Sequence, residues 1–137
     1  MSAKFRTGYM DKALYDLPGV IDEAREELAG VEFDTIVGTG FSGGVVVPAL
    51  AMALGVNFVL IRKEDDDSHH GPGRLIGELG DKWVFVDDFV SSGRTKRRVV
   101  EKIEAAAIVE DQSTEYVGDY LYANVTKKWI PADEEEE

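Results

Sequence analysis

The sequence predicts an α/β domain with a central, mostly parallel sheet of four or five strands flanked by helices. Short apolar runs indicate strands that are buried on both faces, because such strands have no solvent-facing polar side. Segments with helical spacing of apolar residues separate these runs, and strands that alternate with helices build parallel sheets. The three runs that carry this prediction are Phe33–Val37, Asn57–Ile61 and Trp83–Val86.

The first half of the chain predicts two helices and two strands in alternation. Proline in a first turn and glycine after a last turn are typical helix boundaries, which here are Pro18 and Gly30. Gly55 similarly ends an apolar helix. The predicted elements are, in order, a helix over 16–28, a strand over 33–37, a helix over 44–54 and a strand over 57–61.

The second half predicts three further strands and one helix. The turn at Gly80-Asp81 separates a short strand from a strongly apolar one. Near the end of the chain, Tyr116, Gly118, Tyr120 and Tyr122 alternate, and this spacing predicts that they share one face of a strand. The predicted elements are a strand over 74–78, a strand over 83–86, a helix over 94–107 and a strand over 116–125.

Length and charge bound the class of protein. The 137 residues suit one domain, expected over residues 1–131, with 132–137 as a disordered acidic tail. The formal net charge of −12 argues against nucleic-acid binding. No run is long and apolar enough to cross a bilayer, and no signal peptide opens the sequence. With no cysteine in the chain, these features predict a cytoplasmic protein without membrane partners.

An acidic pair followed by a small-residue segment is the main candidate site. Asp87 and Asp88 follow the apolar strand 83–86, at the carboxyl end where open parallel sheets bind ligands. Ser91–Thr95 then offer hydroxyls and a glycine just before a helix, whose free N–H groups attract anions. Carboxylates suit sugar hydroxyls or Mg²⁺, and the segment beside them suits phosphate. A phosphorylated sugar satisfies both halves.

A glycine-rich segment after the first strand admits two interpretations. Gly38, Gly40 and Gly43 match the G-x-G-x-x-G pattern of dinucleotide-binding domains, and Glu64 lies where that pattern places an acid. The chain is short for such a protein, however, and this interpretation leaves Asp87 and Asp88 without a role. In the alternative, the glycines let the backbone approach a phosphate group.

The thirteen residues from Trp83 to Thr95 resemble the signature of the type I phosphoribosyltransferases, which use phosphoribosyl pyrophosphate (PRPP). The resemblance implies that Asp87 and Asp88 hold the ribose and the metal ion Mg²⁺. It implies that the 5′-phosphate is bound by Ser91, Ser92, Gly93, Arg94 and Thr95. Phe85 and Phe89 are bulkier than the aliphatic residues usual at those positions.

The glycine-rich segment resembles the pyrophosphate loop of adenine phosphoribosyltransferases. That likeness implies a pyrophosphate site, often built around a strained cis peptide, formed by Thr39, Gly40, Phe41 and Ser42. Ser42 stands where the adenine enzymes carry an arginine.

The segment from Arg62 to Gly71 resembles the catalytic loop of orotate phosphoribosyltransferases. Arg62, Lys63 and His70 match its cations, which contact the pyrophosphate when the loop closes. Asp65–Asp67 lie where the family carries a further lysine, and the role of the neighbouring His69 is open. In the family this loop often reaches a neighbouring subunit, which implies a homodimer.

The resemblance implies an enzyme that transfers the 5-phosphoribosyl group from PRPP to a nitrogenous base and releases pyrophosphate. The base is left open, with nucleoside monophosphate as product and a reduced hood over the base. Candidates to contact the base are Phe89, Ser91 and Trp129, and the other hood aromatics are Phe5, Tyr9, Tyr120 and Tyr122. The alternative in another class is a non-catalytic regulator that senses PRPP or a nucleotide.

Overall fold

A computed structural model of the chain describes residue 3 and residues 15–62, 75–89 and 93–134, without the side chain of Ser42. The helices in these ranges are α2 (Leu17–Glu27), α3 (Gly40–Leu54) and α4 (Arg94–Val109), with a 3-10 turn η2 (Ala132–Glu134). The strands are β1 (Thr35–Thr39), β2 (Asn57–Ile61), β3 (Leu75–Gly77), β4 (Lys82–Asp87), β5 (Glu115–Leu121) and β6 (Trp129–Pro131).

The strands form one sheet in the order β3-β2-β1-β4-β5-β6. The four central strands are parallel, and the edge strands β3 and β6 are antiparallel to their neighbours. The prediction of a mostly parallel α/β sheet is confirmed, but the described sheet has six strands rather than four or five. The sequence pattern missed β6 because it is only three residues long and ends in Pro131, which cannot donate a ladder hydrogen bond.

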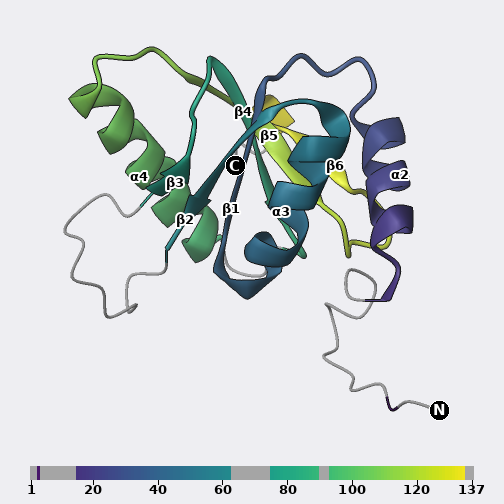
Figure 1. Cartoon of the computed structure of the whole chain (residues 1–137). Helices are drawn as coiled ribbons and strands as arrows, with labels where there is room; N and C mark the ends of the chain where they lie inside the picture. The colour runs from purple at the N-terminus through teal and green to yellow at the C-terminus, as the bar shows by residue number, and fades with distance from the viewer. Residues whose placement is uncertain (1–2, 4–14, 63–74, 90–92, 135–137) are drawn as a thin grey trace.

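Helices cover both faces of this sheet, as Figure 1 shows, with α4 on one side and α2 and α3 on the other. Neighbouring residues of each strand pack on opposite faces, because side chains alternate along a strand. Ile36 and Val84 pack against α2 and α3, whereas Val37 and Trp83 pack with α4. Two layers of apolar side chains therefore fix the sheet between the helices.

The element boundaries differ from the prediction mainly around β1. The strand begins at Thr35, two residues later than predicted, and α3 begins at Gly40, four residues earlier. Gly40 has φ 72°, a left-handed conformation that glycine adopts without strain, so the chain passes directly from strand to helix. Other helices and strands lie within a few residues of their predicted bounds, and β2 coincides with its prediction.

The prediction that three tyrosines share one face is confirmed for Tyr120 and Tyr122 but is wrong for Tyr116. Trp83 of β4 pairs with Tyr116, but the next residue, Val84, pairs with Gly118, so β5 has a bulge at Val117. The additional residue moves Tyr116 to the α4 face, where its ring centroid lies 4.9 Å from that of Trp83. Tyr120 packs on the opposite face against α2 and α3.

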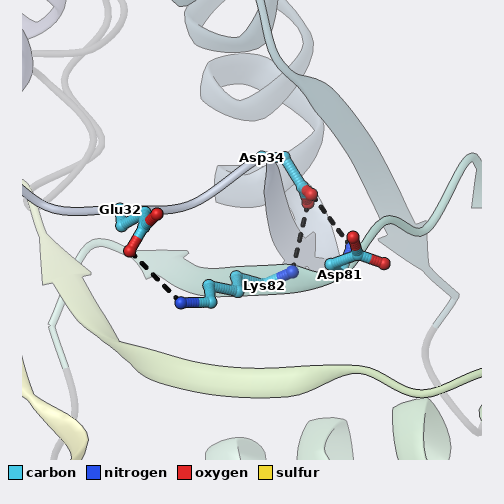
Figure 2. A network of polar contacts seen from close by, with 4 residues as sticks. All are labelled: Glu32, Asp34, Asp81 and Lys82. Carbon is cyan, nitrogen blue, oxygen red and sulfur yellow. Dashed lines mark hydrogen bonds and ion pairs between the residues drawn. The ribbon is translucent and has the colours of Figure 1, made fainter.

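A polar network ties the amino ends of β1 and β4 together (Figure 2). The Asp34 carboxylate accepts hydrogen bonds from the Asp81 amide at 3.0 Å and the Lys82 amide at 3.2 Å. Burial acts to raise the pKa of Asp34, but these bonds and one from the Thr35 hydroxyl outweigh it and lower that pKa. The Lys82 ammonium also contacts Glu32 at 3.3 Å. This network therefore fixes the turn that precedes β4. The turn lies at the amino ends of the parallel strands, away from the carboxyl ends where Asp87 lies.

We expect Asp34→Asn to lower stability at neutral pH by about 1 kcal/mol, because the amide cannot accept both backbone hydrogen bonds. A carboxyl whose folded pKa is lowered stabilises the fold above its unfolded pKa, which is ordinarily 3.8, and loses that contribution as pH falls through the folded pKa. The difference in unfolding free energy between wild type and variant should therefore shrink below about pH 4. Urea titrations at a series of pH values measure this; a difference that is constant with pH contradicts it.

The end of the chain is more ordered than predicted. Residues 132–134 form η2, and the Glu134 carboxylate pairs with the Lys127 ammonium, so part of the expected disordered tail is structured. Residues 135–137 lie outside the described ranges. Within the described ranges, every helix is too short or too polar to span a membrane.

Candidate active site

The carboxyl ends of the four parallel strands meet at one edge of the sheet. Thr39 pairs with Ile61 of β2, and Asp87 pairs with Leu121 of β5. The pairing of β1 with β4 ends at Val37 and Phe85, and Thr39 and Asp87 each follow two residues later as the last residues of their strands. Neighbouring strands lie about 5 Å apart, which brings the predicted pyrophosphate and ribose residues into one row. This edge is where α3 and α4 begin (Figure 1).

The acidic pair is held by its own backbone and by β5. The Asp87 carboxylate accepts a hydrogen bond from the Asp88 amide at 2.9 Å, and Asp88 accepts one from the Phe89 amide at 2.6 Å. The two backbone carbonyls accept from the amides of Tyr122 and Ala123. The β4–β5 pairing thus continues past the last strand residue. Asp87, Asp88 and Phe89 are each partly exposed, so a ligand at this edge can reach the pair.

The glycine-rich segment packs closely where β1 meets α3. A Cβ atom on Gly38 would lie 2.6 Å from the Val47 side chain, and one on Gly43 would lie 3.0 Å from the Gly38 backbone. Thr39 donates its hydroxyl to the Ile61 carbonyl at 2.6 Å, which fixes the end of β1 against β2. Residues 39–41 therefore present their backbone at the edge, with Phe41 69% exposed.

The cis peptide predicted within Thr39–Ser42 is absent: the described backbone contains none. The glycine at position 40 supplies the sharp turn instead, through its positive φ. The pyrophosphate site that we predicted at residues 39–42 remains a prediction.

The candidate phosphate site is described in part. Gly93 precedes α4 with φ 80°, and Arg94 and Thr95 form the exposed start of the helix. The free N–H groups of a first helical turn suit a phosphate. Ser91 and Ser92 lie outside the described residues, so their part in the site stays a prediction.

Arg62 follows β2 and also lines a cavity of about 1050 Å³ on the α4 side of the sheet. Most of the other lining is apolar, including Val59, Leu75 and Val109. Phosphate groups require hydrogen-bond donors and cations, so we place the candidate site at the strand ends rather than in this cavity. Arg62 lies where the cavity approaches that edge.

Several predicted site residues lie elsewhere or outside the described ranges. Lys63, the loop residues Asp65–Asp67 with His69 and His70, and the hood candidates Phe5 and Tyr9 are outside them. Trp129 lies on the edge strand β6, where a Cβ on Gly118 would come within 2.6 Å of its ring. Its indole therefore packs over β5, and a role in base stacking remains a prediction.

Tyr120 and Tyr122 are fully buried among core residues on the α2–α3 face. Burial, followed by the charges of Glu23 and Glu27, raises the pKa of the Tyr120 hydroxyl, which stays protonated. These tyrosines therefore act as core side chains.

Sequence reasoning missed a buried polar cluster beside the site. The Asp119 side chain is 4% exposed, accepts a hydrogen bond from the Tyr116 hydroxyl, and pairs with the Lys96 ammonium at 3.3 Å. Burial raises the pKa of Asp119, and its two partners oppose that rise. Burial and Asp119 also raise the pKa of the Tyr116 hydroxyl. The available signal was a lone carboxylate within the otherwise apolar run 117–122.

Comparison with known proteins agrees with this geometry. No protein-family model matches the chain. Orotate phosphoribosyltransferase of Ralstonia pickettii is 40% identical over 84 residues, which cover 57% of this chain and 37% of that protein. Orotate phosphoribosyltransferase of Methanoculleus marisnigri is 32% identical over 107 residues, covering 76% of this chain and 62% of that protein. The chain thus spans between about a third and two thirds of the length of these relatives.

Solved structures show the same fold. Leishmania donovani UMP synthase aligns with a TM-score of 0.65 and 22% identity, over 88% of this chain and 28% of that one. Adenine phosphoribosyltransferase of Rhodothermus marinus aligns with a TM-score of 0.60 and 20% identity, over 86% and 73%. Mycobacterium tuberculosis orotate phosphoribosyltransferase, solved with PRPP, aligns with a TM-score of 0.50 and 20% identity, over 74% and 56%.

The fold defines the chain as an α/β protein with a mostly parallel sheet whose carboxyl-end residues form the candidate site. Within that class, the chain is a relative of the type I phosphoribosyltransferases and has their fold, as the signature at Trp83–Thr95 indicated. The strand order by itself does not exclude the dinucleotide-binding alternative, because dinucleotide-binding sheets have the same order. That alternative loses support because the sequence relatives of the chain are orotate phosphoribosyltransferases.

Proposed function

We propose that the chain is a phosphoribosyltransferase domain that transfers the phosphoribosyl group of PRPP to a nitrogenous base, with orotate as the first base to test. The observation that carries this is the row of strand ends joining Thr39, Asp87 and the start of α4. Pyrophosphate, ribose and 5′-phosphate are linked in that order in PRPP. The names of the relatives supply orotate as the candidate base.

In this reaction the bond from the ribose C1′ to a pyrophosphate oxygen breaks, and pyrophosphate leaves with the electron pair. A nitrogen of the base then forms the new bond to C1′. Positive charge develops on the ribose, where Asp87 and Asp88 contact the hydroxyls and stabilise it. Backbone N–H groups near Gly40, with Arg62 and Lys63, receive the negative charge of the leaving group. No covalent intermediate on the protein is needed.

The acidic pair fits a magnesium ion. Magnesium prefers oxygen ligands and is usually held by one or two carboxylates together with substrate phosphates. Asp87 and Asp88 supply two adjacent carboxylates, and one oxygen of each accepts a backbone amide. The described residues hold no cluster of three or more candidate ligands. When bound, the ion would neutralise charge on the pyrophosphate.

The test is a screen of purine and pyrimidine bases, including orotate, for PRPP-dependent release of pyrophosphate. We expect release with one base and none without PRPP or Mg²⁺. If Mg·PRPP binds tightly and every base fails, the protein is a regulator that senses PRPP. If Mg·PRPP does not bind by calorimetry, the proposal fails, and micromolar binding of NADH or NADPH would favour the dinucleotide interpretation. Homodimerisation is a separate proposal, which analytical ultracentrifugation tests.

Arg62→Ala or Lys63→Ala should lower kcat/KM by roughly tenfold to a hundredfold, because each removes a cation that stabilises the leaving pyrophosphate. The affinity for the product nucleotide should change little, since that product carries no pyrophosphate. Arg25→Ala is a matched control, because it removes an exposed cation of α2, on the other face of the sheet. Equal losses of product affinity and kcat/KM would show that these residues do not act on pyrophosphate.

A further inference from the structure

The first turn of α4 lacks the usual local means of fixing a helix start. Its N-cap is Gly93, which has no side chain to cap the helix, and the first turn of the described helix holds no acidic residue. Lys96 lies in that turn instead, where a cation opposes the helix dipole. An uncapped start with an unfavourable charge tends to fray, yet Gly93–Thr95 form part of the candidate phosphate site.

A buried contact from β5 compensates for both deficits. The Lys96 side chain is 20% exposed, and its ammonium lies 3.3 Å from the Asp119 carboxylate. It also lies 6.0 Å from the centre of the Tyr116 ring. Asp119 is one of two buried polar residues within the described ranges, the other being Thr35. A tertiary ion pair thus holds the helix start where a local cap is missing.

The position of Asp119 links this pair to the acidic pair. Asp119 pairs with Phe85, two residues before Asp87 on the neighbouring strand. The bulge at Val117 places Tyr116 on the α4 face, within hydrogen-bonding reach of Asp119. The strand that flanks the ribose-binding acids therefore also holds the first turn of α4.

We propose that Asp119 is a positioning residue: through Lys96 it fixes the first turn of α4 at the distance from Asp87 and Asp88 that a ribose 5-phosphate spans. This role rests on the proposed function. Asp119 itself is only 3% exposed, so in this proposal it acts through Lys96 and not on the ligand directly. It sets where the described part of the phosphate site, Gly93–Thr95, lies.

The variants separate positioning from stability. Asp119→Asn removes the carboxylate charge that the Lys96 ammonium contacts, whereas Asp119→Asn combined with Lys96→Met removes both charges. Removing one partner of a buried pair is costly, but replacing both is often nearly neutral. Lys96→Arg keeps the ion pair. Asp34→Asn is the matched control, because it removes a hydrogen-bonded carboxylate at the opposite edge of the sheet.

Ribose 5-phosphate and pyrophosphate are the two probes, measured by calorimetry. We expect Asp119→Asn to weaken the binding of ribose 5-phosphate about tenfold and the binding of pyrophosphate less than about twofold. The reason is that only ribose 5-phosphate is expected to contact the start of α4. The double variant should regain stability but not ribose 5-phosphate affinity, and Lys96→Arg should stay near wild type. Amide exchange of residues 93–98 should accelerate in Asp119→Asn and stay unchanged in Asp34→Asn.

Three results would overturn the inference while leaving the proposed function intact. The first is recovery of ribose 5-phosphate affinity together with stability in the double variant. The second is equal weakening of both probes, and the third is unchanged amide exchange at residues 93–98. If wild type binds neither Mg·PRPP nor ribose 5-phosphate, the proposed function fails and the positioning role with it, even where amide exchange shows that Asp119 holds the helix.

Discussion

Replacing both Asp87 and Asp88 by asparagine is expected to weaken Mg·PRPP binding by roughly 1–3 kcal/mol, which is about fivefold to 150-fold in Kd. Asparagine keeps the shape of each side chain and one acceptor oxygen, so the turn from Asp87 to Phe89 can persist. The variant loses the two negative charges that, in the proposed function, would face the ribose and the metal ion. The loss in kcat/KM should be larger, roughly a hundredfold to a thousandfold, because charge on the ribose develops only in the transition state.

Calorimetry gives the affinity, and initial rates with the base found in the screen give kcat/KM. The matched control changes two other carboxylates, Asp111→Asn with Asp133→Asn, which alters net charge equally at exposed positions away from the strand ends. Asp111 has φ 55°, a conformation that asparagine also tolerates. If the control loses as much affinity as the acidic-pair variant, the effect is long-range electrostatics and the site assignment is wrong.

Trp83→Ala should cost roughly 3–5 kcal/mol of stability, the range for removing a large buried aromatic side chain. Trp83 is 1% exposed and packs with Tyr116 and the α4 residues of its core layer. Its loss leaves a cavity between the sheet and α4. The free energy of unfolding of natural domains is only about 5–15 kcal/mol, so a large part of the chain's stability depends on this residue.

Urea unfolding measured by tryptophan-independent circular dichroism tests this prediction. Trp83→Phe should cost less, because it retains an aromatic ring in the same layer. Val125→Ala removes a side chain that is 93% exposed and should change stability by less than about 0.5 kcal/mol. A Trp83→Ala variant as stable as Val125→Ala would show that the α4 layer is not packed as described.

The candidate site could be predicted largely from contiguous residues. Trp83–Thr95 carry an apolar strand, an acidic pair and a helix start within one short segment, and side-chain periodicity and turn residues are local properties. The same local signals located β2 and the bounds of α2. The end of α3 at Gly55 was predicted because a helix often ends at a residue in the left-handed conformation, and glycine adopts that conformation most easily.

Other features depend on residues far apart in the chain. The pattern of β5 predicted four residues on one face, but the pairing of Trp83 with Tyr116 and of Val84 with Gly118 introduces a bulge. No periodicity within β5 reveals a partner more than thirty residues earlier. The antiparallel edge strand β6 was missed because it ends in Pro131, a residue that argues against a strand when only the sequence is read.

The sequence by itself therefore determined the class of fold and the acidic pair at a strand end, because both follow from patterns among residues that are close together in the chain. Only the tertiary structure decided the sheet order, the bulge at Val117 and the pairing of Lys96 with Asp119. A buried charge pair forms where folding brings a helix start over a distant strand. Partial exclusion of water strengthens the attraction between the two charges but also costs them hydration, so the pair depends on a tertiary environment that no linear pattern encodes.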